Sequence, residues 1–280
     1  TGFALDPVEK KPFARWHGGS FLLSVGSYGC NLHCPFCQNY DISQGGESAV
    51  PWREITPAEL VEHALELRTR GNIGIAYTYN EPLVGYEFVL DCSQLARKYG
   101  LKNVLITNGF IEKEPLEELL PLIDAMNIDI KGNGEFYREM ISGDLTPVMA
   151  TVERSLAKCH IEITNLIIPG VNDTADDIAN LAQWVASLGK DTPLHLNRYF
   201  PNYKLDLPAT PVATVERARE IARGYLDYVY TGNGADPKSA NTYCPTCKLE
   251  LISRRIFPAK VALDEGSCPR CGGMVAGVFL

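Results

Sequence analysis

The chain has 280 residues, 45% of them hydrophobic and 21% charged, with a formal net charge of −8. This length accommodates one large enzyme domain with a small appendage. The acidic balance disfavours nucleic acid as the main partner, because neutralising phosphates needs clustered Lys and Arg. No apolar run approaches the roughly 20 residues of a membrane span, and Thr1–Lys11 lacks the features of a signal peptide. We therefore expect a cytoplasmic protein without a membrane partner, and a gene start upstream of Thr1.

Short apolar, β-rich runs alternate with helical patterns between residues 20 and 231. Their nearly continuous hydrophobicity is typical of parallel strands that are covered on both faces. The predicted strands are Phe21–Val25, Ile73–Tyr79, Val104–Thr107, Ala125–Ile130, Ile161–Ile168, Leu194–Asn197 and Tyr228–Tyr230.

The segments between these runs carry helix signals. Thr56-Pro57-Ala58-Glu59 is a capping box with Pro at the first helical position, and this helix is expected to stop before Gly71. The other predicted helices are Leu83–Tyr99, Lys113–Leu122, one opened by Asn172-Asp173-Thr174 and running to Leu188, and Pro211–Gly224.

Repeated βα units predict a parallel sheet. Six or seven units are too few for the usual eight-fold barrel of about 250 residues, so we predict an α/β fold with a partial, open TIM barrel of the (β/α)6 type. The barrel is assigned to residues 20–235, after an N-terminal arm at 1–19. Gly232-Asn233-Gly234 begins a linker, and residues 240–280 form a small zinc-ribbon-like module. Ligand-binding residues should follow the strands, at their C-terminal ends.

Seven of the nine cysteines fall into two sets. Because disulfides are rare in cytosolic proteins, clustered cysteines indicate metal sites, and the isolated Cys92 and Cys159 are interpreted as packed thiols. The sets are Cys30, Cys34 and Cys37, and Cys244, Cys247, Cys268 and Cys271.

The first set has the spacing C-x3-C-x2-C and directly follows the first predicted strand. A zinc ion would want a fourth protein ligand, which His33 could supply between the cysteines. An iron–sulfur cluster usually takes four cysteines, so three would leave one iron open for a substrate or cofactor. The position at the ligand-binding end of a parallel barrel favours the cluster over a structural zinc.

The same segment, with the aromatic Phe36 before its last cysteine, resembles the signature of radical S-adenosylmethionine (SAM) enzymes. The resemblance implies a 4Fe-4S cluster on Cys30, Cys34 and Cys37, with SAM on the open iron. It further implies reductive cleavage of SAM to a 5′-deoxyadenosyl radical that abstracts hydrogen from a substrate. No catalytic side chain is expected beyond the cluster and SAM, because the cofactor carries the hard chemistry. A reducing flavodoxin or ferredoxin is the expected electron donor.

Later loops extend the resemblance. In Tyr79-Asn80-Glu81-Pro82 the first two residues replace the glycines of the family's Gly-Gly-Glu-Pro motif. Thr107-Asn108-Gly109 and Asp129-Ile130-Lys131 look like loops of glycyl-radical-enzyme activases, in which Asp-x-Lys lies at the SAM carboxylate, and Leu166–Gly170 follows the strand where adenine packs. The implied cofactor-binding residues are Phe36, Cys37, Gln38, Tyr79, Asn80, Glu81, Thr107, Asn108, Asp129, Lys131 and His195.

Two positions depart from activases similar to pyruvate formate-lyase activating enzyme. Ile106 stands where those enzymes have an Asp that helps to hold a monovalent cation, and Tyr199-Phe200 stand where they have a His after an aromatic residue. His195 could substitute for that His, or it could be a packed strand residue.

The motifs that carry the resemblance are specific for radical SAM chemistry and much less specific for the substrate. The closest overall similarity is to the radical SAM component of the AmmeMemoRadiSam system, carried by Asp6–Pro12, Cys37–Asn39 with Ile42–Gln44, Tyr77–Pro82 and Tyr230–Asn233. The leading hypothesis is an activase-like enzyme that acts on a protein glycine, such as that of a glycyl radical enzyme. A small-molecule or RNA-modifying radical SAM enzyme is the alternative, and a non-catalytic Fe–S and zinc-ribbon binding protein is the third hypothesis.

The second cysteine set has the spacing C-x2-C-x20-C-x2-C, which is typical of a closed tetrahedral site, with zinc as the first choice. Rubredoxin-like iron fits the same geometry. An auxiliary 4Fe-4S cluster is third, because such clusters usually have tighter spacing. About 40 residues are too few for a free-standing apolar core, so a bound metal is expected to hold the module together.

Overall fold

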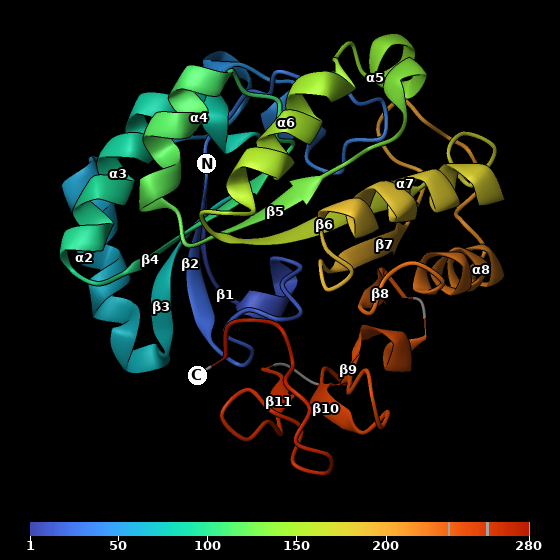
Figure 1. Cartoon of the computed structure of the whole chain (residues 1–280). Coiled ribbons are helices and arrows are strands. Elements are labelled where there is room, and N and C mark those ends of the chain that lie inside the picture. Colours follow the sequence, from blue (N-terminus) through green and yellow to red (C-terminus); the bar gives the residue numbers. More distant parts are fainter. Residues whose placement is uncertain (235, 256–257, 280) are drawn as a thin grey trace.

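The computed structural model describes residues 1–234, 236–255 and 258–279. Its main body is an eight-stranded sheet in which the spatial order of the strands, β1 to β8, equals their order in the chain. Strands β2 to β8 are parallel, and β1 pairs antiparallel with β2 at one edge. Figure 1 shows the sheet curving with its helices on the outside. The predicted parallel α/β architecture is confirmed.

All seven predicted strands are present, within a few residues of their expected ends. The strands are β1 (Gly2–Pro7), β2 (Phe21–Gly26), β3 (Asn72–Tyr77), β4 (Lys102–Thr107), β5 (Ala125–Asp129), β6 (His160–Ile167), β7 (Leu194–Arg198) and β8 (Val229–Gly232). The helices are α1 (Tyr40–Ser43), α2 (Pro57–Glu66), α3 (Tyr86–Lys98), α4 (Lys113–Leu119), α5 (Gly134–Met140), α6 (Leu145–Ser155), α7 (Ala175–Leu188) and α8 (Val212–Arg223). Strand β1 and helices α1, α5 and α6 were not among the predicted elements.

Helix α2 illustrates how local sequence sets the element boundaries. Thr56 Oγ1 accepts a hydrogen bond from Glu59 N at 3.3 Å, and Thr56 N donates to Glu59 Oε2 at 2.8 Å, which completes the predicted capping box. A 3₁₀ turn over Leu67–Arg70 follows, and Gly71 ends it with a φ of 86° that glycine adopts without strain.

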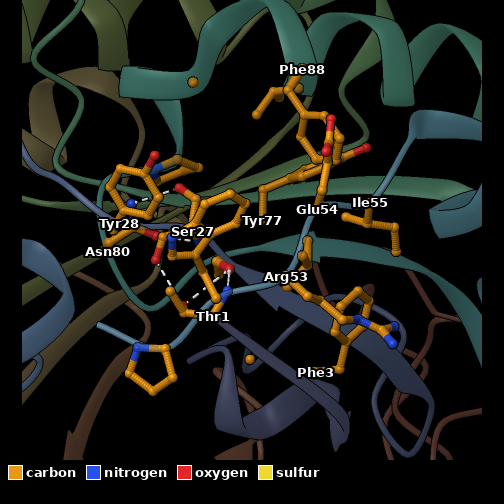
Figure 2. A pocket seen from close by; sticks show the side chains of 18 residues that line it. Thr1, Phe3, Ser27, Tyr28, Arg53, Glu54, Ile55, Tyr77, Asn80 and Phe88 are labelled. Atoms are coloured by element: carbon orange, nitrogen blue, oxygen red, sulfur yellow. Dashed lines mark hydrogen bonds between the residues drawn. The ribbon is translucent and has the colours of Figure 1, made fainter. Parts of the chain in front are cut away.

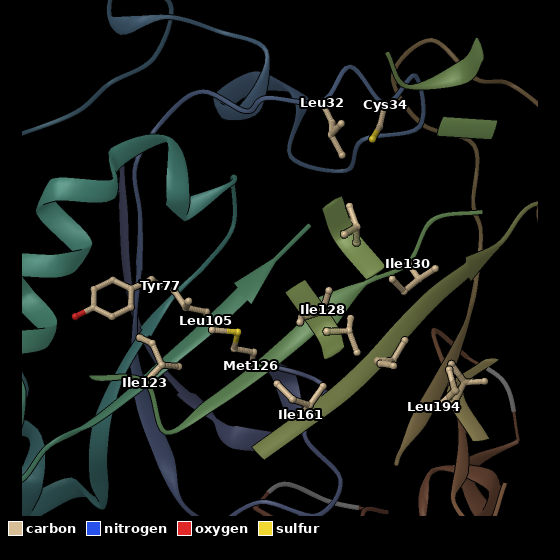
Figure 3. Close-up of a cluster of buried hydrophobic side chains, with 14 of the residues drawn as sticks. Leu32, Cys34, Tyr77, Leu105, Ile123, Met126, Ile128, Ile130, Ile161 and Leu194 are labelled. Atoms are coloured by element: carbon tan, nitrogen blue, oxygen red, sulfur yellow. The ribbon is translucent and has the colours of Figure 1, made fainter. Parts of the chain in front are cut away.

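Two apolar layers surround the sheet. The outer one packs the sheet against its helices and includes Leu105, Ile128 and Leu194 (Figure 3). The inner one fills the barrel at the amino ends of the strands, where Phe13 and Trp16 pack on side chains of the strands. Residues 8–17, which we call the N-terminal segment, thus close one end of the barrel.

The C-terminal part forms a separate three-stranded sheet in the order β11-β10-β9, made of Thr242–Tyr243 (β9), Glu250–Ser253 (β10) and Lys260–Val261 (β11). It lies against the N-terminal segment, since Val278 N donates to Arg15 O at 2.8 Å and His17 N donates to Val278 O at 2.7 Å. Figure 1 shows this module at one end of the barrel. None of the helices in the described part of the chain is long and apolar enough to cross a membrane.

Candidate functional site

A cavity of about 390 Å³ opens at the carboxyl ends of the parallel strands. All three cysteines of the first set line it, and so does Leu166 at the end of β6. It also brings together every predicted cofactor-binding residue except His195, namely Phe36, Cys37, Gln38, Tyr79, Asn80, Glu81, Thr107, Asn108, Asp129 and Lys131. These residues come from the cysteine loop and from the loops after β3, β4 and β5.

One sulfur of the cysteine loop, that of Cys30, accepts hydrogen bonds from two N–H donors. Gly29, with a φ of 88°, turns the chain directly before Cys30. Cys30 Sγ lies 3.4 Å from the backbone N of Leu32 and 3.7 Å from Nδ2 of Asn108, which both donate to it. Cys34 is only 7% exposed, and burial raises the pKa of its thiol to about 11. A bound metal centre would supply the positive charge that this buried sulfur needs to ionise.

The cysteine loop is held in place from two sides. On one side Leu32 and Cys34 belong to the outer apolar layer, together with Ile128 (Figure 3). On the other side the loop after β7 reaches across, since Asn202 Nδ2 donates to Cys37 O at 2.8 Å. Because these anchors lie far apart in the sequence, the loop geometry depends on the completed barrel.

Glu81 ties together the loops that follow β3 and β4. Its carboxylate accepts hydrogen bonds from Leu83 N at 3.1 Å, Thr107 Oγ1 at 2.7 Å and Asn108 N at 2.7 Å. Burial raises the pKa of Glu81, although these hydrogen bonds oppose that shift. The carboxylate therefore orients Asn108 toward the cysteine loop.

Asp129 and Lys131 form an ion pair on the cavity wall, with Lys131 Nζ 2.9 Å from Asp129 Oδ2. Burial lowers the pKa of Lys131, but the attraction of Asp129 outweighs it and holds the pKa above its usual range. The second carboxylate oxygen, Asp129 Oδ1, is buried without a hydrogen-bond partner. Such an orphaned acceptor fits a bound molecule that brings its own donors, as the amino and hydroxyl groups of SAM would.

Tyr79 and Asn80, which replace the family's glycines, have distinct roles in the loop after β3. Tyr79 adopts a glycine-like φ of 75°, and its hydroxyl donates to Asp6 Oδ2 at 3.0 Å. Asn80 Oδ1 accepts from Ser27 N at 3.0 Å, and Asn80 Nδ2 donates to Gly29 O at 3.0 Å. Asn80 thereby joins this loop to the cysteine loop.

The structure does not bring His195 to the cavity, among the described residues that line it. His195 Nε2 lies 2.5 Å from Glu162 Oε2, and its ring stacks on Tyr230 at 5.2 Å. The Leu-His-Leu strand context suits this packed environment, because the alternation of a strand points His195 into the barrel near its closed end.

Other residues that line the cavity were missed by sequence reasoning. They include Lys10, Lys11 and Pro12 of the N-terminal segment, with Asn127, Thr164, Asn197 and Asn233. Asn127 could have been found, because side chains two residues apart in a strand share a face and Asp129 was predicted. Nothing in the sequence pattern assigned the N-terminal segment to this cavity.

A second cavity, of about 570 Å³, lies on the outer face of the sheet near β1 and β3 (Figure 2). Tyr77, Phe88 and Trp52 contribute aromatic walls, and Asn80 borders both cavities. Neither cysteine nor histidine occurs among the described residues that line it. The three cysteines that could hold an iron–sulfur cluster therefore lie at the smaller cavity.

The second cysteine set forms a compact site in the C-terminal module. The sulfurs of Cys244 and Cys271 lie 3.6 Å apart, as do those of Cys247 and Cys268, and all four sulfurs lie within 4.8 Å of one another. Tetrahedral ligands at about 2.3 Å from one zinc ion would be separated by about 3.8 Å. These four cysteines could hold a single metal ion.

The pKa values of the thiols in this set are not alike. A hydrogen bond from the backbone N–H of Cys247 lowers the pKa of Cys244 to about 6. The backbone N–H of Gly273 lowers the pKa of Cys271, but the nearby sulfurs of Cys244 and Cys247 outweigh it and raise that pKa to about 11. A cation at the centre would remove this repulsion between neighbouring thiolates.

Comparison with known proteins agrees with this geometry. Residues 24–185 match the model of the Radical SAM superfamily. The chain is 46% identical to the uncharacterized protein MJ0808 of Methanocaldococcus jannaschii, over 96% of this chain and 81% of that protein. It is 25% identical to pyruvate formate-lyase 1-activating enzyme of Escherichia coli, over 70% of this chain and 86% of the relative.

Solved structures share the fold. Streptococcus suis SuiB bound to S-adenosylmethionine superposes with a TM-score of 0.59 at 13% identity, over 80% of this chain and 55% of that one. Members of this superfamily are enzymes that use SAM and a 4Fe-4S cluster. On the match of its sequence from residue 24 to residue 185, the chain belongs to the radical SAM superfamily.

Proposed function

We propose that this protein reductively cleaves SAM at a 4Fe-4S cluster held by Cys30, Cys34 and Cys37. The observation that carries the proposal is the cavity in which these three cysteines meet the ends of β3, β4 and β5. The buried, unpartnered Asp129 Oδ1 on its wall supports a ligand there that brings hydrogen-bond donors. When bound, the cluster would supply the electron that cleaves SAM to a 5′-deoxyadenosyl radical able to abstract hydrogen.

In this proposal the protein's own residues bind and orient. Asn108 and the backbone N–H of Leu32 stabilise the Cys30 sulfur, and Glu81 holds Asn108 in position. The Asp129–Lys131 pair presents both charges to the methionine end of SAM, a zwitterion that can pair with each of them. No general base is required, since the cofactor carries the chemistry.

The test is a spectroscopic one. Anaerobically reconstituted protein, once reduced, should show the EPR signal of a 4Fe-4S cluster, and SAM should alter that signal. Cys34→Ala should abolish both, whereas the matched variant Cys159→Ala, which alters a cysteine outside the cavity, should keep both. A SAM-responsive cluster that survives in Cys34→Ala would contradict the proposal.

We further propose that the substrate is a protein glycine, as in an activase. The 25% identity to an enzyme named for activating pyruvate formate-lyase supports this substrate class. Cells fed with deuterated glycine provide a protein fraction labelled at glycine, and cells grown in deuterium oxide provide deuterated RNA and small-molecule fractions. Deuterium should appear in 5′-deoxyadenosine only with the protein fraction. Transfer from the RNA or small-molecule fraction would replace this hypothesis with one of the alternatives.

For the C-terminal module we propose one structural zinc ion on Cys244, Cys247, Cys268 and Cys271. The sulfur separations of 3.6 Å support a single ion rather than a cluster. Anomalous scattering measured at the zinc and iron edges would identify the metal. An iron-edge signal at this site would overturn the assignment.

The proposed cluster needs an electron donor in the cell. The radical SAM superfamily requires a reductant, and we propose flavodoxin or ferredoxin in the cytoplasm. All nine cysteines are free of disulfides, which supports a reducing compartment. Reduction of the cluster by purified flavodoxin or ferredoxin, followed by EPR, would test the choice of donor. If neither protein reduced the cluster, this assignment would fail.

A further inference from the structure

The N-terminal segment has two functional sides. On one side Lys10, Lys11 and Pro12 line the cavity that holds the first cysteine set. Asn127 Nδ2 donates to Pro12 O at 2.8 Å. Asn127 precedes Asp129 by two residues in β5, which places it about 6–7 Å further from the mouth. Lys10–Pro12 therefore form the deep end of the cavity, beyond the residues proposed to bind SAM.

Contacts of Lys11 hold the cavity-facing side of the N-terminal segment in place. Its side chain is buried, with Nζ 2.9 Å from Asp6 Oδ2 and 4.4 Å from the centre of the Tyr79 ring. Lys10 Nζ lies 3.6 Å from Asp6 Oδ1, so one carboxylate faces two ammonium groups. The deep wall of the cavity consequently carries an excess of positive charge.

On its other side the segment is bound by a buried carboxylate. Glu162 is fully buried and accepts hydrogen bonds from Ala14 N at 2.8 Å and Arg15 N at 2.8 Å. His160 and His195 flank the same carboxylate at 2.9 Å and 2.5 Å. Two consecutive backbone amides are thus fixed to the interior of β6.

The C-terminal module covers this same side. Arg254 donates to Ala14 O, and Val278 exchanges backbone hydrogen bonds with Arg15 and His17 at 2.8 Å and 2.7 Å. Ala14 also belongs to the apolar core of the module, in which Cys244 and Cys268 are buried. The segment therefore lies between the four-cysteine site and the deep end of the cavity.

We propose that Lys10, Lys11 and Pro12 form the wall that receives the substrate, and that the metal-bound C-terminal module positions this wall through Ala14–His17. This inference rests on the proposed function for the role of the cavity. The module acts through the segment, so its residues are positioning residues that touch neither SAM nor substrate. Loss of the metal should disturb the deep wall while leaving the cysteine loop intact, because the loop is anchored from Ile128 and Asn202 instead.

Hydrogen exchange on the full chain tests the positioning directly. Chelation of the module's metal should speed exchange of the His17 amide, which donates to Val278 O, at least about tenfold, the equivalent of about one lost hydrogen bond, whereas the Ala14 and Arg15 amides remain bound to Glu162. Because chelation could unfold the whole module, Arg254→Gln provides a milder variant, which should retain the metal and should also speed exchange of the His17 amide. Arg255→Gln is the matched control, since its side chain is exposed and pairs with Glu250 at 3.3 Å within the module. Unchanged exchange after chelation and in Arg254→Gln would overturn the proposal.

A second measurement distinguishes an effect on substrate binding from an effect on SAM binding. Arg254→Gln and Lys10→Gln should raise the concentration of deuterated protein fraction needed for half-maximal transfer to 5′-deoxyadenosine, at least threefold, with SAM affinity unchanged. An equal loss of SAM affinity would show that the wall serves SAM, and would refute the substrate role. If wild-type protein assembles no SAM-responsive cluster, the proposed function fails, whereas the exchange experiment still reports on the positioning.

Discussion

The two ends of the barrel hold sulfur sites of different design. At the mouth, three cysteines lie on an irregular loop, two of them partly exposed, and hydrogen bonds from other loops fix its shape. At the closed end, four cysteines from two tight turns bring their sulfurs within 4.8 Å of one another. An incomplete ligand set beside a cavity suits chemistry, whereas a complete set suits structure.

The separation of these ends has a functional consequence. Strand β6 has 8 residues, a length of roughly 26 Å, and the two sites lie beyond opposite ends of such strands. Changes at the closed end should lower the stability of the protein and leave SAM affinity intact. Changes at the mouth should lower SAM affinity and leave the stability intact. The predictions below test this separation, from the largest expected effect to the smallest.

The largest effect should follow from Cys244→Ser. Loss of one ligand should release the metal, and structural zinc contributes on the order of 10 kcal/mol to the folding of small modules. Residues 240–280 should become sensitive to limited proteolysis, while the barrel cluster still responds to SAM by EPR. Cys92→Ser, a buried cysteine outside both sites, serves as a control for metal content. A protease-resistant module without metal would contradict the structural role.

Glu162→Ala should destabilise the protein by about 3–5 kcal/mol, because it leaves His160, His195 and two backbone amides without their buried partner. Denaturant unfolding at pH 7 would measure the loss, and SAM affinity should remain that of the wild type. A drop in SAM affinity without a loss of stability would place Glu162 in the functional site instead.

The same carboxylate predicts a pH dependence. Burial raises the pKa of Glu162, but hydrogen bonds from His160 and His195 outweigh it and hold the pKa well below its usual range. The unfolded chain, with a Glu pKa of about 4.3, takes up the proton first as the pH falls. The stabilisation is therefore present above about pH 4.3 and is lost progressively in more acidic solution. The difference in unfolding free energy between wild type and Glu162→Ala should shrink from pH 6 to pH 3.

These contacts also explain what could be predicted from the sequence. Apolar runs, the capping box at Thr56 and the cysteine spacings are local signals, and they predicted the strands, helix α2 and both cysteine sets. Strand β1 was missed because Gly2–Pro7 is a short edge strand that ends in proline and gains its structure by pairing with β2. The contacts of Glu162 with Ala14 and Arg15 join positions nearly 150 residues apart, so no local pattern could predict them.

At the mouth, Lys131→Ala should weaken SAM binding by about 10- to 100-fold, the range expected when a charged hydrogen-bond partner is lost. Iron content should be unchanged, since Lys131 is not a cluster ligand in this proposal. Isothermal titration with SAM under anaerobic conditions would measure the affinity. Lys113→Ala, which alters an exposed side chain at the start of helix α4, is the matched control and should bind SAM normally. Loss of iron in Lys131→Ala would show that the residue supports the cluster rather than SAM.

The smallest expected effect is that of Tyr79→Phe, at the junction between the two ends. Burial and the neighbouring Asp6 raise the pKa of Tyr79 to about 12, so the hydroxyl stays protonated and donates to the carboxylate. Removing it should cost about 1 kcal/mol of stability, since the Phe ring can still pack against Lys11. In a protein of this size that loss corresponds to a decrease of about 2–4 °C in Tm. SAM affinity should not change, because the hydroxyl points toward β1. If SAM affinity fell while Tm stayed constant, Tyr79 would belong to the mouth, and the separation of SAM binding from the closed end of the barrel would be wrong at this residue.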